Sequence, residues 1–211
     1  MMRLRQLASI ATVFILPFQG QAQTYAEFQA LFQDSAFGRL HVYSHQEFLT
    51  PQDSVFEGRE IPGSLLTFIG REPDSSGNKF HAVIRFPFGK KLEGFLVRQP
   101  IRYHSTLISL YIFHSKKRRL VASIDLADGW GEVGWSFLQD SWLMDYDQNG
   151  SLDIITRTTH LQRRRGSPSR KTIVDEMSVF IWAGNGFRRI QHVRNRPFHS
   201  NYRLRWTGKT H

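Results

Sequence analysis

Short runs rich in β-branched and aromatic residues recur along the chain, and segments rich in Gly, Pro, Asn, Asp or charged residues separate them. Apolar or alternating runs of about 4–8 residues bounded by turn-forming residues are typical of β-strands. The pattern therefore predicts a mostly β protein whose strands follow one another as an antiparallel meander. The expected strands cover residues 65–69, 80–88, 92–97, 106–114, 120–126, 135–144, 152–160, 171–182 and 187–192.

One segment near the N-terminus has the spacing of a helix. From Tyr25 to Phe37, apolar side chains recur at intervals that place them on one helix face. Thr24 and Glu27 fit a capping box at its start, and Gly38 fits its end. We expect one N-terminal helix that packs against the sheet through Tyr25, Phe28, Leu31 and Phe32.

The run from Thr106 to Phe113 is apolar on both of its faces. Because successive side chains of a strand point to opposite faces, this pattern predicts a central strand that is covered on both sides. We therefore expect an antiparallel meander or small sandwich with one N-terminal helix. It would form a single β-rich domain over residues 23–194, with a calcium loop at residues 145–153 and a basic, flexible tail at residues 195–211.

The first residues have the layout of a secretory signal peptide. Two arginines precede an apolar core at residues 7–18, and Gly20-Gln21-Ala22 offers a small-x-small cleavage site. The core is interrupted by Pro17 and is shorter than the ~20 residues of a membrane-spanning helix. We expect cleavage of residues 1–22 after Ala22, which gives a secreted or periplasmic protein without a transmembrane segment. An uncleaved anchor is the alternative.

The amino-acid composition excludes several kinds of functional site. The chain contains no cysteine, which excludes disulfides, thiolate catalysis and zinc sites with cysteine ligands. Lys and Arg outnumber Asp and Glu by 28 to 18, and the excess lies after Arg163. The basic residues of the tail at 195–211 alternate with aromatic ones. Such a tail either keeps the protein soluble or binds a polyanion, of which a polysaccharide is favoured over nucleic acid.

The most distinctive motif is the segment Asp145-Tyr146-Asp147-Gln148-Asn149-Gly150-Ser151-Leu152-Asp153. Ca²⁺ binds ~6–8 oxygen ligands, and a short loop can supply them from alternating positions. A glycine stands at the sixth position of such loops, where the chain turns sharply, and Gly150 occupies that position. We predict one structural Ca²⁺ site. Its ligands would be the side chains of Asp145, Asp147, Asn149 and Asp153 and the carbonyl oxygen of Ser151.

The residues after this loop favour a strand and not the helix of an EF-hand. A bidentate Glu would stand at the twelfth position of an EF-hand loop, where this chain has Thr156 in a β-branched run. A strand–loop–strand site of this kind resembles the calcium loops of FG-GAP/VCBS repeats in extracellular proteins. The resemblance covers about Ser141 to Arg157 and extends to residues 179–187, which resemble the hairpin that ends such a repeat. It implies a β-connection held together by the ion. Asn149 departs from the pattern, because these repeats commonly carry Asp there.

A metal-free hairpin loop is the alternative interpretation of the motif. Asp and Asn side chains often accept hydrogen bonds from nearby backbone N–H groups in turns without any ion. However, the carboxylates of Asp145, Asp147 and Asp153 repel one another unless a cation lies between them. The sequence therefore favours bound calcium.

The segment from Asp125 to Trp135 is the best candidate for a catalytic cleft. Its three glycines predict a flexible turn, and its acids would serve a carbohydrate-active or other hydrolytic enzyme. Trp130 and Trp135 either stack on a sugar ring or pack beside the calcium hairpin, and packing is favoured. The sequence has no nucleophile-elbow or phosphate-loop motif. The acids would be Asp125, Asp128 and Glu132.

These patterns together favour a non-enzymatic protein. We expect an exported, β-rich chain with one structural calcium site that acts as a binding or structural module of the cell envelope or extracellular space. The hydrolytic enzyme and the polyanion-binding protein remain as alternatives.

Overall fold

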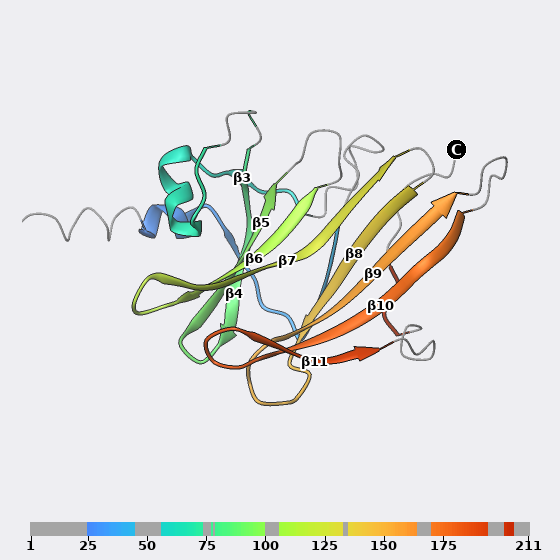
Figure 1. Cartoon of the computed structure of the whole chain (residues 1–211). Helices are drawn as coiled ribbons and strands as arrows, with labels where there is room; N and C mark the ends of the chain where they lie inside the picture. The colour runs from blue at the N-terminus through green and yellow to red at the C-terminus, as the bar shows by residue number, and fades with distance from the viewer. Residues whose placement is uncertain are drawn as a thin grey trace, which may run out of the picture.

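The computed structural model describes residues 25–44, 56–73, 77, 79–99, 106–132, 135–163, 170–193 and 201–204. The expected signal peptide at residues 1–22 lies outside them. The described strands form one sheet in which β4 to β11 are successive antiparallel neighbours (Figure 1), which confirms the mostly β fold and its meander order. The strands are β1 (Gln33–Asp34), β2 (Arg39–Tyr43), β3 (Arg59–Glu60), β4 (His81–Gly89), β5 (Leu92–Gln99), β6 (Leu107–His114), β7 (Arg119–Glu132), β8 (Trp135–Met144), β9 (Asp153–Arg163), β10 (Arg170–Trp182) and β11 (Phe187–Val193).

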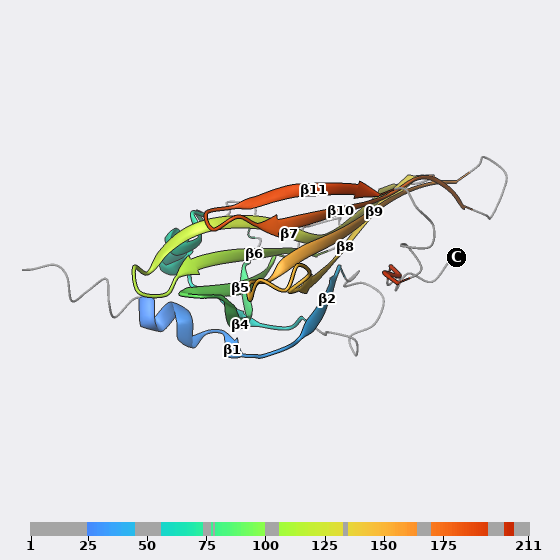
Figure 2. The ribbon, with the colours of Figure 1, turned by 90° about the horizontal axis from the view of Figure 1, so that it is seen from below.

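β7 divides the sheet into two halves because it changes its partner. It pairs with β6 as far as Ala127 and with β8 from Asp128 onward. The first half contains β1, β3, β4, β5, β6 and the start of β7, and the second half contains the end of β7, β8 to β11 and β2. Side chains of both halves meet in one core, so the sheet curls into a small sandwich (Figure 2). This core includes Val83, Phe88, Leu96, Leu110, Leu126, Leu143, Ile154 and Trp182.

β6 is the central strand that the sequence predicts. Ile108, Leu110 and Ile112 point into the core between the two halves. Tyr111 and Phe113 point to the opposite face and are buried in a second core. Both faces of β6 are therefore covered, which explains why both faces carry apolar side chains.

Two helical segments cover the outer face of the first half. They are residues 25–30 and the 3-10 helix η1 (Gly63–Ile69), and both lie beside the strands of the first half in Figure 1. They form the second core with the sheet, as expected for the N-terminal helix. None of the helices in the described part of the chain is long and apolar enough to cross a membrane. The second core includes Tyr25, Phe28, Phe32, Leu65, Leu66, Ile69, Phe95, Tyr111 and Phe113.

Residues 201–204 lie on the outer face of the second half. Tyr202 is buried there against Trp142, with their ring centroids 5.1 Å apart. Its carbonyl oxygen accepts a hydrogen bond of 2.7 Å from Arg157 on β9. These residues belong to the tail at 195–211, and the rest of that tail lies outside the described residues. The third core formed at this face comprises Trp142, Ile155, Met177, Val179, Ile181 and Tyr202.

Three local expectations are corrected by the fold. The N-terminal helix ends at residue 30 and not at Phe37, because Gln33 and Asp34 join β4 as a short parallel strand. Residues 65–69 belong to η1 and not to a strand, since Leu65, Leu66 and Ile69 are all buried on one side of a helical turn. Nor did the sequence pattern predict β2, which pairs with the distant residues 140–144 of β8.

The hydroxyl group of Tyr25 is buried and has no hydrogen-bond partner among the described residues. Leaving a buried polar group unpaired costs about 1–3 kcal/mol. Tyr25→Phe removes this hydroxyl while keeping the ring, so we expect the free energy of unfolding to rise by about 1 kcal/mol at neutral pH. Chemical denaturation of both proteins measures this difference.

The same substitution should also change the behaviour at alkaline pH. Burial, followed by the negative charge of Glu93, raises the pKa of Tyr25 to about 12. The folded state therefore holds the phenol proton more tightly than the unfolded chain, whose tyrosines titrate near pH ~10. The stability that depends on this proton is present below pH ~10 and is lost as the pH rises toward about 12. A Tyr25→Phe protein that loses the same stability in this window would contradict the assignment.

Candidate metal centre

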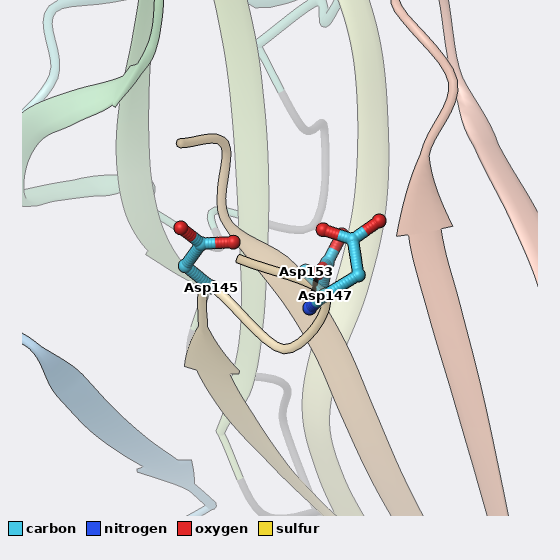
Figure 3. Close-up of side chains that lie close together, drawn as sticks. All are labelled: Asp145, Asp147 and Asp153. Atoms are coloured by element: carbon cyan, nitrogen blue, oxygen red, sulfur yellow. Dashed lines mark hydrogen bonds between the residues drawn. The ribbon is translucent and has the colours of Figure 1, made fainter. Parts of the chain in front are cut away.

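The predicted calcium loop connects β8 to β9 at one end of the second half. Asp145 directly follows the last residue of β8, and Asp153 is the first residue of β9. Figure 3 shows the Asp145 carboxylate at one side of the loop and the Asp147 and Asp153 side chains at the other. The hairpin therefore brings the first, third and ninth residues of the motif to the same end of the sheet.

The three carboxylates lie close enough to share one ion. Asp145, Asp147 and Asp153 each offer an oxygen atom, and these atoms lie within 4.8 Å of one another. Two oxygen ligands of a Ca²⁺ ion at ~2.3–2.6 Å can be at most about 4.6–5.2 Å apart, so the observed separation fits one shared ion. The group combines a buried Asp153, a half-buried Asp145 and an exposed Asp147.

The loop backbone wraps around these carboxylates. Asp145 accepts hydrogen bonds from the backbone N–H groups of Asn149 and Gly150, at 3.0 and 2.9 Å. Gly150 has a φ of 81°, in the left-handed region that its predicted place in the loop requires. Gln148 also lies in this region, with a φ of 60°. The sequence pattern gave no indication of that second left-handed residue.

The other two expected ligands have different surroundings. The side-chain amide of Asn149 donates to Asp147 at 2.9 Å, and its carbonyl oxygen accepts a hydrogen bond of 2.8 Å from the N–H of Ser151. The hydroxyl side of Ser151 faces Gly89 in β4, where an added Cβ would lie 2.9 Å from Oγ. The structure therefore brings the three aspartates together and ties Asn149 to one of them.

Asp153 connects the loop to β10. Its Oδ2 accepts the backbone N–H groups of Tyr146 and Asp147 at 3.0 and 3.3 Å, and its Oδ1 accepts that of Trp182 at 3.0 Å. Burial raises the pKa of Asp153, the three N–H groups lower it, and the charge of Asp147 raises it further. A cation beside this carboxylate would favour its ionised form, because it would offset both burial and the like charge.

The loop is also fixed to the first half of the sheet. The N–H of Leu152 donates to the carbonyl oxygen of Phe88 in β4 at 3.0 Å. The Phe88 ring contacts Trp182 and Phe187, with centroid distances of 5.3 and 5.9 Å. The loop motif at residues 145–153 did not predict these contacts with Phe88. The segment 179–187 contacts the loop through the hydrogen bond of Trp182 to Asp153.

Hydrogen bonds alone do not neutralise the three charges. Each carboxylate oxygen has two lone-pair directions, so the N–H groups leave room for a further partner. The ion pairs found within the described ranges join other residues, and no Lys or Arg among them is paired with Asp145, Asp147 or Asp153. The arrangement can hold a hard cation that prefers oxygen ligands.

The segment from Asp125 to Trp135 differs from the flexible turn that the sequence predicts. β7 continues through Gly129 and Gly131 to Glu132, because this stretch pairs with β8. Asp125 accepts a hydrogen bond of 2.6 Å from Ser109 on β6, and Asp128 accepts one of 2.7 Å from the N–H of Gly129. Asp125 thus bonds to β6 in the first half of the sheet, whereas Asp128 bonds to the next residue of its own strand. The side chain of Glu132, the third candidate acid, lies outside the described part of the structure.

Trp130 and Trp135 contact each other, with ring centroids 4.2 Å apart. They lie near the start of β8, whereas the calcium loop follows its last residue, so they do not pack beside that loop.

Comparison of the chain with models of protein families, with curated proteins and with solved structures gave no match. The resemblance to FG-GAP/VCBS repeats therefore stays a prediction from the loop residues.

Proposed function

We propose that this chain is an exported, β-rich protein whose β8–β9 loop binds one structural Ca²⁺ ion and that it acts as a binding or structural module of the cell envelope or extracellular space. The observation that carries the proposal is the group of three carboxylate oxygens within 4.8 Å, one of them from a buried residue. The order of polar residues in the loop supports the same ion. The export signal predicted from residues 1–22 would place the protein in a compartment in which calcium is plentiful.

The ligand set favours calcium over other common metals. It consists of carboxylates, with an amide and a carbonyl group nearby, and contains neither Cys nor His. Hard cations such as Ca²⁺ and Mg²⁺ prefer oxygen ligands, whereas zinc and copper prefer nitrogen or sulfur. Ca²⁺ accepts irregular coordination, and Mg²⁺ demands a near-octahedral shell and usually keeps several waters. A loop that uses its own carboxylates and backbone suits the larger ion.

The ion would stabilise the fold and not take part in a reaction. It would neutralise the like charges of Asp145, Asp147 and Asp153 and so remove a repulsion at the end of the hairpin. Because Asp153 also bonds to Trp182, the ion would strengthen the attachment of the β8–β9 loop to β10. A cysteine-free exported protein gains rigidity in this way without a disulfide.

Calcium titration of the melting curve tests the proposal. Extracellular modules bind Ca²⁺ with Kd of ~10⁻⁴–10⁻³ M, so about 10 mM Ca²⁺ should stabilise the protein by about 1.4–2.7 kcal/mol. The midpoint should rise by roughly 3–10 °C for a chain of this size. Asp147→Ala removes an exposed ligand and should abolish the rise.

The matched control is Glu72→Ala, which removes an exposed acid away from the loop. It should keep the full response to calcium. Mg²⁺ at the same concentration should give a smaller rise than Ca²⁺. Superimposable melting curves of the unaltered protein with calcium and with chelator would refute the proposal.

A further inference from the structure

A second group of side chains shares one face of β7, β8 and β9, far along the strands from the calcium loop. The strands are in continuous register here, and residues that pair across strands lie on the same face. Alternate residues along each strand share that face as well. Three rows of described side chains result: Trp135 and Gln162; Trp130, Phe137 and His160; and Asp128, Gln139 and Thr158.

Four rings of this face contact one another. Trp135 lies 4.2 Å from Trp130 and 5.5 Å from His160, and Phe137 lies 5.2 Å from His160 and 6.3 Å from Trp130 between ring centroids. We name these four residues the aromatic face. They form a continuous surface across three strands and not a set of scattered side chains.

The aromatic face is not part of any of the three cores found among the described residues. Each of its four side chains is partly exposed, whereas Trp142 and Trp182 in the cores are 3% and 7% exposed. Part of the surface of each ring therefore remains accessible, and covering it would contribute further free energy. Contiguous apolar groups of this kind commonly mark a binding surface.

The topology explains why these rings are outside the central core. β6 pairs with β7 only as far as Ala127, and the aromatic face begins beyond that point. In Figure 1, β7 to β10 run to the right beyond β4 and β5, which lie in the first half. The strands of the first half, whose side chains contribute to the central core, therefore do not lie opposite this end of the second half.

Polar side chains border the rings on the same face. Asp128 pairs with Gln139, which in turn pairs with Thr158, so a carboxylate, an amide and a hydroxyl form the row next to Trp130, Phe137 and His160. The Gln139 side chain is held in place by its hydrogen bond of 2.9 Å to the carbonyl oxygen of Asp125. Donors and acceptors thus lie in the row next to the aromatic face.

We propose that the aromatic face and its polar row bind a neutral saccharide chain. A sugar ring has an apolar face of C–H groups, which packs on aromatic rings, and a rim of hydroxyl groups, which need hydrogen-bond partners. Recognition sites of small molecules combine such apolar walls with a few placed polar groups. The carboxylate of Asp128 would repel an acidic saccharide, and the described side chains of the three rows include no Lys or Arg to attract one. The chemistry therefore selects a neutral chain.

This inference does not rest on the calcium proposal. The loop and the aromatic face lie at opposite ends of β8, and no residue belongs to both. Asp147→Ala should remove the calcium response and leave saccharide binding unchanged. The two proposals can therefore fail separately.

Binding of soluble neutral oligosaccharides built from glucose, mannose, galactose or N-acetylglucosamine tests this inference on the full mature chain. Calorimetric titration should detect at least one of them, and Trp130→Ala should weaken its affinity about tenfold or more, because aromatic anchors dominate binding energies. Trp130→Phe keeps a ring and should lose less. Ile190→Ala, which removes an exposed apolar side chain on β11, should bind as the unaltered protein does.

Several outcomes would overturn the inference. They are no binding to any member of this panel, binding that Trp130→Ala leaves unchanged, and binding only to the acidic chain polygalacturonate or to anionic phospholipid vesicles. The last result would identify the surface as a contact for polyanions or membranes. Circular dichroism of each variant ensures that a loss of binding is compared between folded proteins.

Discussion

Asp153→Ala is expected to lower the free energy of unfolding by about 3 kcal/mol even when a chelator removes all divalent ions. The substitution deletes the acceptor of three backbone N–H groups, which come from Tyr146, Asp147 and Trp182. The hydrogen bond to Trp182 is buried, so its N–H group would lose its partner without reaching water. Each such loss costs about 1–3 kcal/mol. Urea denaturation in chelator measures the change.

Asp147→Ala is the matched control for this prediction. It removes a carboxylate of the same cluster, but its side chain is exposed and its hydrogen bonds lie within the loop. We expect it to cost less than about 1 kcal/mol in chelator, as exposed substitutions usually do. If both variants unfold at the same urea concentration, Asp153 does not anchor the loop.

Asp153→Asn separates the two oxygen positions. The amide keeps one carbonyl oxygen, which can accept the N–H of Trp182, but its NH₂ group would then face the N–H groups of Tyr146 and Asp147. Its stability should therefore lie between those of the unaltered protein and Asp153→Ala. The calcium response should fall in both, because both remove a charged ligand. Comparison with Asp147→Ala thus distinguishes the ion's contribution from that of the backbone contacts.

The strands of the meander could be predicted because their signal is local. Each of the runs from β4 to β11 is bounded by turn residues and is rich in side chains that favour a pleated surface. For β6 the pattern also predicted its place in the sheet, because apolar residues on both faces of a strand indicate that both faces are covered.

The elements that were missed depend on contacts between distant parts of the chain. The periodicity that begins at Tyr25 continues through Phe32, but Gln33 and Asp34 pair with β4 and are therefore extended. Short apolar runs such as 65–69 fit a strand or a buried helical turn equally well. β2 contains the strand-forming residues Val42 and Tyr43, but it is only five residues long, and its partner β8 is distant in the sequence.

In the candidate site, too, the local features could be predicted from the sequence and the contacts with distant residues could not. Spacing alone predicted that Asp145, Asp147 and Asp153 would come together, because a tight hairpin brings its alternate positions to one side. It could not predict that Asp153 would bond to Trp182, which is 29 residues further along the chain. That contact depends on how β10 pairs with β9, and it makes one of three similar aspartates the structural one.

Phe28→Ala is the second substitution for which we expect a large effect, a loss of about 3–5 kcal/mol in the free energy of unfolding. The Phe28 side chain is fully buried, and its ring lies 5.0–5.8 Å from those of Phe32, Phe68, Phe95 and Phe113 between centroids. These rings come from the N-terminal segment, η1, β5 and β6. Truncation would leave a cavity where the helical segments meet the first half of the sheet. Thermal unfolding followed by circular dichroism should show a lower midpoint.

Glu72→Ala, which removes an exposed side chain outside the three cores, is the control and should change stability by less than about 0.5 kcal/mol. Equal midpoints for the two variants would mean that residues 25–30 do not contribute to the folded core. Calcium should still stabilise Phe28→Ala by the same amount as the unaltered protein, because Phe28 and the loop contact different cores. Distant substitutions without shared partners are additive, whereas a smaller calcium response would show that the second core and the metal loop are coupled through the strands between them.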